Sequence, residues 1–207
     1  MKKFLSLQTV LLRTNAFTII ELLVVIGIIS ILAVALLVSL NPAEAQKRAR
    51  DSQRLKDMNT LQAMLEQYIN DGGAISGCAT GRPCASNTVT GTSPNPCGTA
   101  NWMALNFCTW SKTVPTDPAN GSLRTCVLGD GTLSATTCLM RYRAVFSGSN
   151  YEIGTLFEST TNAGKLLNDG GTTTAGNACR NLFQIMSSTE LTTCGTFTLD
   201  GGSTAAY

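Results

Sequence analysis

Residues 17–40 read FTIIELLVVIGIISILAVALLVSL, a run of 24 residues that holds a single charged side chain, Glu21. A helix rises about 1.5 Å per residue, so this run reaches about 36 Å and crosses a hydrocarbon core of about 30 Å. Three basic residues precede it, Lys2, Lys3 and Arg13. By the positive-inside rule this basic flank stays in the cytoplasm, so the sequence predicts a single-pass membrane helix with the rest of the chain outside.

The helical pattern continues beyond the apolar run, from residue 41 to about residue 71. Asn41-Pro42 is able to bend the helix, because proline lacks an N–H and clashes with the preceding turn. Apolar residues then recur at three- and four-residue steps, as in an amphipathic helix: Leu55, Met58, Leu61, Leu65, Tyr68 and Ile69. Charged residues occupy much of the remaining surface: Lys47, Arg48, Arg50, Asp51, Arg54, Lys56 and Asp57. Gly72-Gly73 is a natural stop, so we expect one helix of about 55 residues from Phe17 to Asp71.

The eight cysteines all lie beyond the helix and suit an oxidising compartment: Cys78, Cys84, Cys97, Cys108, Cys126, Cys138, Cys179 and Cys194. The sequence has no histidine and no Cys-x-x-Cys, so disulfides are favoured over zinc ligation. Eight cysteines permit 105 complete pairings, and the sequence leaves the connectivity open. A Cys126–Cys138 bridge would enclose Gly129-Asp130-Gly131, a turn able to reverse the chain.

Short strands are predicted in the second half of the chain. Alternating apolar residues favour a hairpin of 139–146 against 151–157, with its apolar face on the helix. A third strand is expected near 196–199, and a short helix or extended loop over 177–189. Residues 72–106 are expected to be loops held by cysteines. The predicted fold class is therefore α+β, with a long N-terminal helix packed on a small antiparallel sheet.

The charge content argues against several functions. Only 14% of residues are charged, and without residues 1–16 the chain has 12 basic and 13 acidic residues, so nucleic-acid binding is not predicted. The sequence has no G-x-S-x-G and no phosphate-binding glycine loop, so we expect no enzyme, cofactor or metal site. Glu152 and Glu158 are expected to be solvated. Three aromatic residues, Trp102, Phe107 and Trp110, are expected in the core, with a patch that binds sugar or a host surface as the alternative.

Glu21 is the most informative residue, because a carboxylate inside a membrane helix costs roughly 2.5–3.5 kcal/mol. One way to avoid this cost is for the Glu21 side chain to snorkel, so that its carboxylate reaches the lipid headgroups. The string AFTIIELLVVI at residues 16–26 also closely resembles the class III signal of type IV prepilins and pseudopilins. The resemblance implies leader cleavage between Ala16 and Phe17, N-methylation of Phe17, and a role in assembly for Phe17 and Glu21. Ala16 stands where most members carry glycine, and Gly27 and Pro42 do not match the helix-softening pair of the family.

The resemblance also implies the organisation and the partners of the chain. Residues 1–16 would be a cytoplasmic leader, 17–40 the transmembrane and polymerisation half of the helix, 41–71 its amphipathic half, and 72–207 a globular pilin-like domain. The expected function is a subunit of a type IV pilus-like filament, with a pseudopilin of a secretion filament as the alternative. The partners would be other copies, the prepilin peptidase and an inner-membrane assembly machine. The chain would start in the inner membrane and end in an extracytoplasmic filament.

Two later segments resemble pilins more weakly. A Cys179–Cys194 pair is similar to the C-terminal disulfide-bounded region of many pilins. Val114-Pro115-Thr116-Asp117-Pro118 is similar to the P-x-D-P segment that precedes strands in this family. We expect a rigid turn there, because proline fixes φ and aspartate accepts from nearby amides, and favour it over calcium binding.

The pairing of Phe17 with Glu21 has a physical basis of its own. Cleavage before Phe17 creates an ammonium four residues from the carboxylate, and each charge lowers the cost of the other in the bilayer. In a filament the amine of one copy would meet Glu21 of a shifted neighbour, which favours one stagger while apolar packing holds the helices together. A rival interpretation takes Ala43-Glu44-Ala45 as a signal-peptidase site that releases a soluble domain beginning at Gln46.

Overall fold

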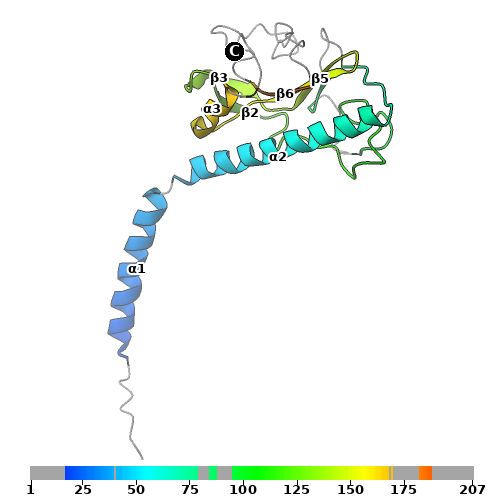
Figure 1. Cartoon of the computed structure of the whole chain (residues 1–207). Helices are drawn as coiled ribbons and strands as arrows, with labels where there is room; N and C mark the ends of the chain where they lie inside the picture. The colour runs from blue at the N-terminus through cyan, green and yellow to red at the C-terminus, as the bar shows by residue number, and fades with distance from the viewer. Residues whose placement is uncertain are drawn as a thin grey trace, which may run out of the picture. The chain divides into compact units, whose positions relative to one another are not determined.

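The computed structural model describes residues 17–39, 41–78, 84–87, 95–167, 169 and 182–187. The chain divides at Pro42 into two compact units, residues 1–42 and 43–207. The described part of the first unit is the helix α1 (Ile19–Ser39). The second unit holds α2 (Pro42–Asn70), two antiparallel sheets and a short α3 (Ala163–Leu166) (Figure 1). The α+β class expected from the sequence is therefore present.

The expected single helix from Phe17 to Asp71 is wrong, because this stretch holds two helices, α1 and α2. Asn41 adopts a positive φ of 41°, which an α-helix cannot contain. Pro42 then occupies the first position of α2, where its missing N–H would have no helical partner in any case. The Asn41-Pro42 pair thus ends one helix and starts the next, at the boundary expected between the apolar and amphipathic halves.

The end of α2 confirms the predicted stop. Gly72 has a φ of +82°, and its N–H donates to the carbonyl of Ile69 at 3.0 Å. The N–H of Gly73 reaches back to the carbonyl of Tyr68 at 2.9 Å. These two bonds form a Schellman motif, which satisfies carbonyls that the helix end would leave without donors.

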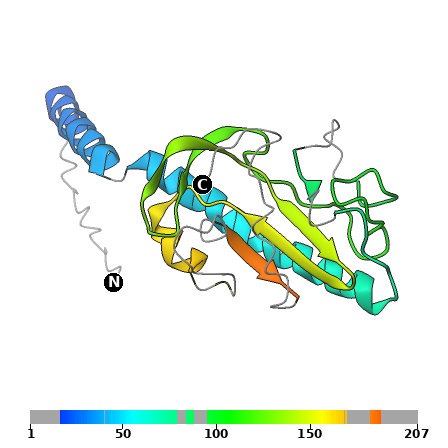
Figure 2. The ribbon, with the colours of Figure 1, turned by 90° about the horizontal axis from the view of Figure 1, so that it is seen from above.

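The larger sheet packs on α2 and has the strand order β1-β4-β5-β6 (Figure 2). Its strands are β1 (Cys84–Ala85), β4 (Arg143–Ser147), β5 (Asn150–Thr155) and β6 (Phe183–Met186). The predicted hairpin is present as β4 and β5, with Phe146 opposite Tyr151. Its predicted first strand began too early, because Leu139 ends another strand.

The smaller sheet consists of β2 (Leu123–Val127) and β3 (Leu133–Leu139). A 3₁₀ turn, η1 (Thr160–Asn162), leads into α3. β6 lies in the segment where a short helix or loop was expected, and it is a strand because it pairs with β5 through four residue positions. The strand expected near 196–199 lies outside the described residues.

The core forms where the apolar stripe of α2 meets the large sheet. Met58, Leu61 and Leu65 share one cluster with Tyr142 and Phe146, so the apolar face of the hairpin does meet the helix. The other face of β4 is buried too, because Val145 packs in a second cluster with Cys126 and Cys138. Both faces of β4 are buried, so its alternating apolar and polar residues do not correspond to one face in the core and one in solvent.

Three disulfides hold the described loops and strands. Cys78 pairs with Cys84, Cys97 with Cys108, and Cys126 with Cys138, the pair expected across the turn. The first bridge lies within residues 72–106, the region expected to be held by cysteines, and the second joins that region to a cysteine two residues beyond it. Each closed loop stabilises such a domain by about 2–4 kcal/mol. Cys179 and Cys194, the remaining expected pair, lie outside the described residues.

Candidate functional site

The helix α1 exposes its apolar side chains on every side. Each side chain from Ile19 to Leu37 is exposed, and this segment has the length and composition of a helix that crosses a membrane or serves as a signal sequence. The exposed fractions of its large apolar side chains run from 44% at Val25 to 81% at Ile19. Monomeric soluble proteins rarely keep so large an apolar surface in water, so the surface of α1 suits contact with lipid or with another protein.

Glu21 lies in the first turn of α1, where it also has the position of a capping residue at the start of the helix. The N–H of Glu21 donates to Oγ1 of Thr18 at 3.3 Å and to its carbonyl oxygen at 3.1 Å. Thr18-Ile19-Ile20-Glu21 therefore has the sequence of a capping box, with Thr18 at the cap and Glu21 three residues later. A carboxylate at this position also interacts favourably with the helix dipole. Phe17 is exposed beside it, whereas Ala16 lies outside the described residues.

A buried charge network lies at the first half of α2. The Arg54 side chain is fully buried, and its guanidinium donates to three carboxylates. Nε and Nη2 contact Asp117 at 2.8 and 3.0 Å, Nη1 contacts Asp51 at 2.8 Å, and Nη2 also contacts Glu158 at 2.8 Å. Arg50 donates to both carboxylate oxygens of Glu158 from the next turn. The network thus joins α2 to two loops that are distant in sequence.

Backbone amides complete this network. Asp51 accepts from the N–H groups of Glu158 and Ser159, the latter at 2.9 Å, and from Nδ2 of Asn162 at 3.0 Å. Oδ1 of Asp117 accepts from the N–H of Ala119 at 2.7 Å. A turn is therefore present at the P-x-D-P segment, and its aspartate also binds Arg54.

The buried charges shift one another's proton affinity. Burial alone would lower the pKa of Arg54, but its bonds to Asp117 and Glu158 raise it overall. Burial likewise raises the pKa of Glu158, yet the bonds from Arg50 and Arg54 lower it overall. Both shifts favour the ionised forms, so Arg54 and Glu158 stay charged at neutral pH.

Two further buried acids occupy different surroundings. Asp57 accepts from the hydroxyl of Tyr142 at 2.7 Å, and burial raises its pKa. Glu152 is 1% exposed and faces away from α2, on the opposite side of β5 from Ile153. Its Oε1 accepts from Nε2 of Gln184 at 3.0 Å, while Oε2 is buried and has no hydrogen-bond donor among the described residues. Burial and then repulsion from Asp169 raise the pKa of Glu152 to about 7.

Sequence reasoning placed several of these side chains wrongly. Asp51, Arg54 and Asp57 were expected on the polar surface of the helix, and Glu152 and Glu158 in solvent, but all five are buried. The sequence did contain a signal for the burial of Asp51 and Arg54. These two residues continue the three- and four-residue spacing of the buried Met58, Leu61 and Leu65. Pairing with distant loops was not visible in that spacing. Trp102 and Phe107 are buried as expected, and Trp110 is half-buried against Tyr68.

The described carboxylates do not assemble a metal centre. Within residues 17–39, 41–78, 84–87, 95–167, 169 and 182–187, no group of three or more acidic or cysteine side chains has the arrangement of a metal site. The chemistry of the charge network is structural, since its oxygens are occupied by guanidinium and amide donors. Comparison with family models, with curated proteins and with solved structures found no match for this chain.

Proposed function

We propose that this chain is the structural subunit of a type IV pilus-like filament, assembled through its N-terminal hydrophobic helix after leader cleavage. The observation that carries the proposal is α1, whose apolar side chains are exposed all round and whose first turn holds Glu21. Before assembly, lipid covers this helix; in the filament, copies of the same helix cover it. Packing between apolar helices supplies the attraction, and the Phe17 amine paired with Glu21 of a neighbour sets the stagger.

The processing and the partners follow from the same proposal. The prepilin peptidase removes residues 1–16, and the new amine at Phe17 is methylated. An inner-membrane assembly machine then moves the subunit from the membrane into the filament. The chain is a substrate of this machinery, and its disulfide-held domain lies outside the cytoplasm. The filament serves adhesion, motility, DNA uptake or secretion.

The rival cleavage after Ala45 would remove part of the folded domain. Ala43-Glu44-Ala45 lies in the first turn of α2, and Oε1 of Glu44 accepts from the hydroxyl of Ser159. Glu44 also lies 3.7 Å from the ammonium of Lys47. Loss of residues 1–45 would break these contacts beside the buried network, which favours retention of the segment.

N-terminal sequencing and intact mass of the protein from its native membrane test the proposal. A product that begins at methylated Phe17 is expected, and a product that begins at Gln46 would overturn it. Electron microscopy then separates the two kinds of filament subunit. An abundant surface filament indicates a pilin, whereas lost protein export in a deletion strain without visible filaments indicates a pseudopilin.

A further inference from the structure

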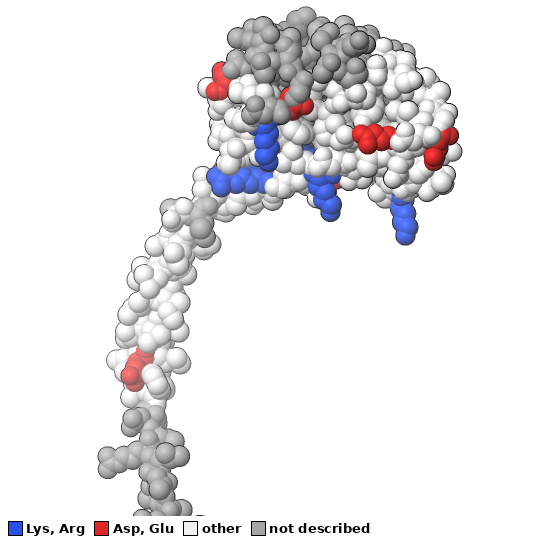
Figure 3. Space-filling model, viewed as in Figure 1, with Lys and Arg blue, Asp and Glu red and all other residues white. Residues whose placement is uncertain are grey.

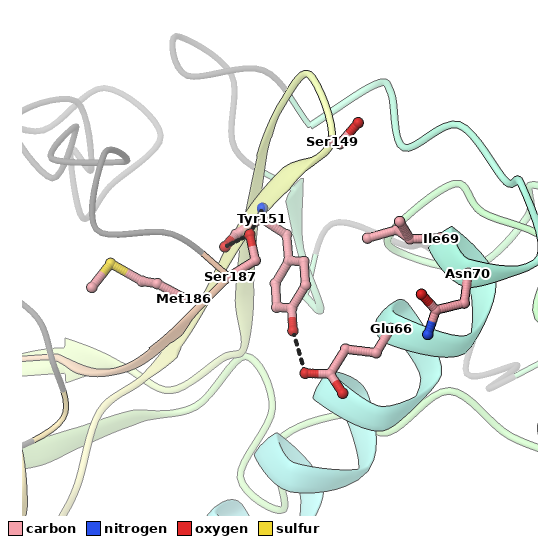
Figure 4. Close-up of a pocket in the computed structure, with 7 residues that line it drawn as sticks. All are labelled: Glu66, Ile69, Asn70, Ser149, Tyr151, Met186 and Ser187. Atoms are coloured by element: carbon pink, nitrogen blue, oxygen red, sulfur yellow. Dashed lines mark hydrogen bonds between the residues drawn. The ribbon is translucent and has the colours of Figure 1, made fainter.

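An open cleft of about 400 Å³ lies beside the C-terminal half of α2 (Figure 4). It is lined by Glu66, Ile69, Asn70, Ser149, Tyr151, Met186 and Ser187. Among the described residues, Glu66 is the one charged member of this lining, and Ile69 and Met186 add apolar contact area. A cleft with a single carboxylate and an apolar wall suits a basic side chain with a long aliphatic stem.

The carboxylate of Glu66 is held in place before any ligand binds. Its Oε1 accepts from the hydroxyl of Tyr151 at 3.1 Å and from Nε2 of Gln62 at 2.8 Å. Figure 4 shows the tyrosine ring pointing from β5 toward the helix and ending at this carboxylate. In the described part of the chain, no cation lies within ion-pair distance of Glu66, so a positioned negative charge is left for a partner.

The same helix carries a matching cation ten residues earlier. Lys56 is exposed and forms no ion pair with any described residue, while the exposed Arg48 lies 3.8 Å from Glu44. Figure 3 shows basic side chains projecting from the side of the globular unit along which α2 runs. The basic residues of α2 thus end at Lys56, and Glu66 is the one charged residue of this helix beyond Asp57.

Helix geometry prevents Lys56 and Glu66 from pairing within one chain. Ten residues separate them by about 15 Å along the axis and by about 80° around it. A parallel copy displaced by about 15 Å along α2 would bring its Lys56 level with this Glu66. We propose that the cleft is an interface for a second copy of this chain, with the partner copy's lysine seated on Glu66.

The proposal rests on the filament function and adds a lateral contact to it. The two patches differ, so the contact is heterologous, and a heterologous contact that does not close into a ring propagates as a filament. A surface ion pair contributes little to affinity but strongly affects register and association rate. The expected effect is therefore on the rate and order of filament growth, and it weakens as salt rises.

Charge reversal in full-length chains tests the contact. Glu66→Lys and Lys56→Glu are each expected to lower filament yield roughly tenfold at low salt, and the double variant to restore it. Glu66→Gln keeps an oxygen acceptor for Tyr151 and Gln62 and is expected to lower yield without loss of folding, as judged by circular dichroism. The matched control is Lys112→Glu, which reverses an exposed cation outside α2 and is expected to assemble like the wild type.

The outcomes separate this contact from the proposed function. If the wild type forms filaments and the single variants match it, or the double variant is no better than the singles, the lateral contact is overturned and the filament function stands. If Glu66→Gln assembles like the wild type, the charge has no part in the contact and the inference is again overturned. If the wild-type chain forms no filament in its native cell, both proposals fail.

Discussion

Arg54 and Asp117 lie 63 positions apart in sequence, yet two hydrogen bonds of 2.8 and 3.0 Å join them in a fully buried pair. The fork of a guanidinium matches the two oxygens of a carboxylate, so the pair fixes both distance and orientation. It ties the P-x-D-P turn to α2. The folded domain therefore depends on the buried charge of Arg54, although the residue pattern of α2 predicts that this side chain is exposed.

Arg54→Met is expected to destabilise the domain by about 3–5 kcal/mol, because it leaves three buried carboxylates without their shared cation. Urea unfolding of unassembled subunits, followed by circular dichroism, measures this loss. Lys56→Met is the control on the same helix and should change stability by less than about 0.5 kcal/mol, since Lys56 is exposed. Equal losses in the two variants would contradict the structural role of Arg54.

The stability of the domain is expected to respond to pH through Glu152. Its folded pKa of about 7 lies above the ordinary value of 4.5, so the folded state holds this proton more tightly than the unfolded chain. Its contribution to stability is then fully present below about pH 4.5 and is lost as pH rises through about 7, a change on the order of 3 kcal/mol.

Glu152→Gln isolates this effect, because the amide keeps an acceptor for Gln184 and does not ionise. The lowered pKa of Glu158 acts in the opposite sense, since its contribution is lost as pH falls. The measurement is therefore the wild-type stability minus that of the variant, at pH 5 and pH 8. A difference that does not change between the two values would show that Glu152 stays in one protonation state.

Two substitutions at Glu21 separate its charge from its place in the helix cap. Glutamine serves a capping box as well as glutamate does, whereas alanine does not. If the carboxylate pairs with the Phe17 amine of a neighbour, Glu21→Gln and Glu21→Ala should both fail to join wild-type subunits in staggered filaments. Co-expression with tagged wild type and electron microscopy measures this. Normal filaments from Glu21→Gln would leave capping as its role.

Gly72→Ala is expected to cost about 1–2 kcal/mol, because a residue with a Cβ adopts the left-handed conformation, here a φ of +82°, only at a cost in backbone energy. Nothing lies within 4 Å of a Cβ built at this position, so the loss would come from backbone conformation and not from a clash. Thermal unfolding of Gly72→Ala beside Gly27→Ala gives the comparison. Gly27 has open space, no positive φ and a helical position, where alanine is favoured.

The sequence by itself determined the features that depend on neighbouring residues. The run from Phe17 to Leu40 is apolar enough to form α1, Asn41-Pro42 interrupts it, and Gly72-Gly73 ends α2, because backbone conformation and hydrophobic spacing are local properties. The Cys126–Cys138 bridge belongs to the same class, since a short turn brings the two residues together.

The tertiary structure decided what depends on partners distant in the chain. A charged residue on a helix is compatible with solvent or with burial, and Arg54 is buried because Asp117 and Glu158 reach it from two separate loops. β6 is a strand because β5 offers it an edge, and Glu152 is buried because both faces of that sheet are covered. Spacing along one helix cannot specify these contacts, because their free energy arises only when the distant segments meet.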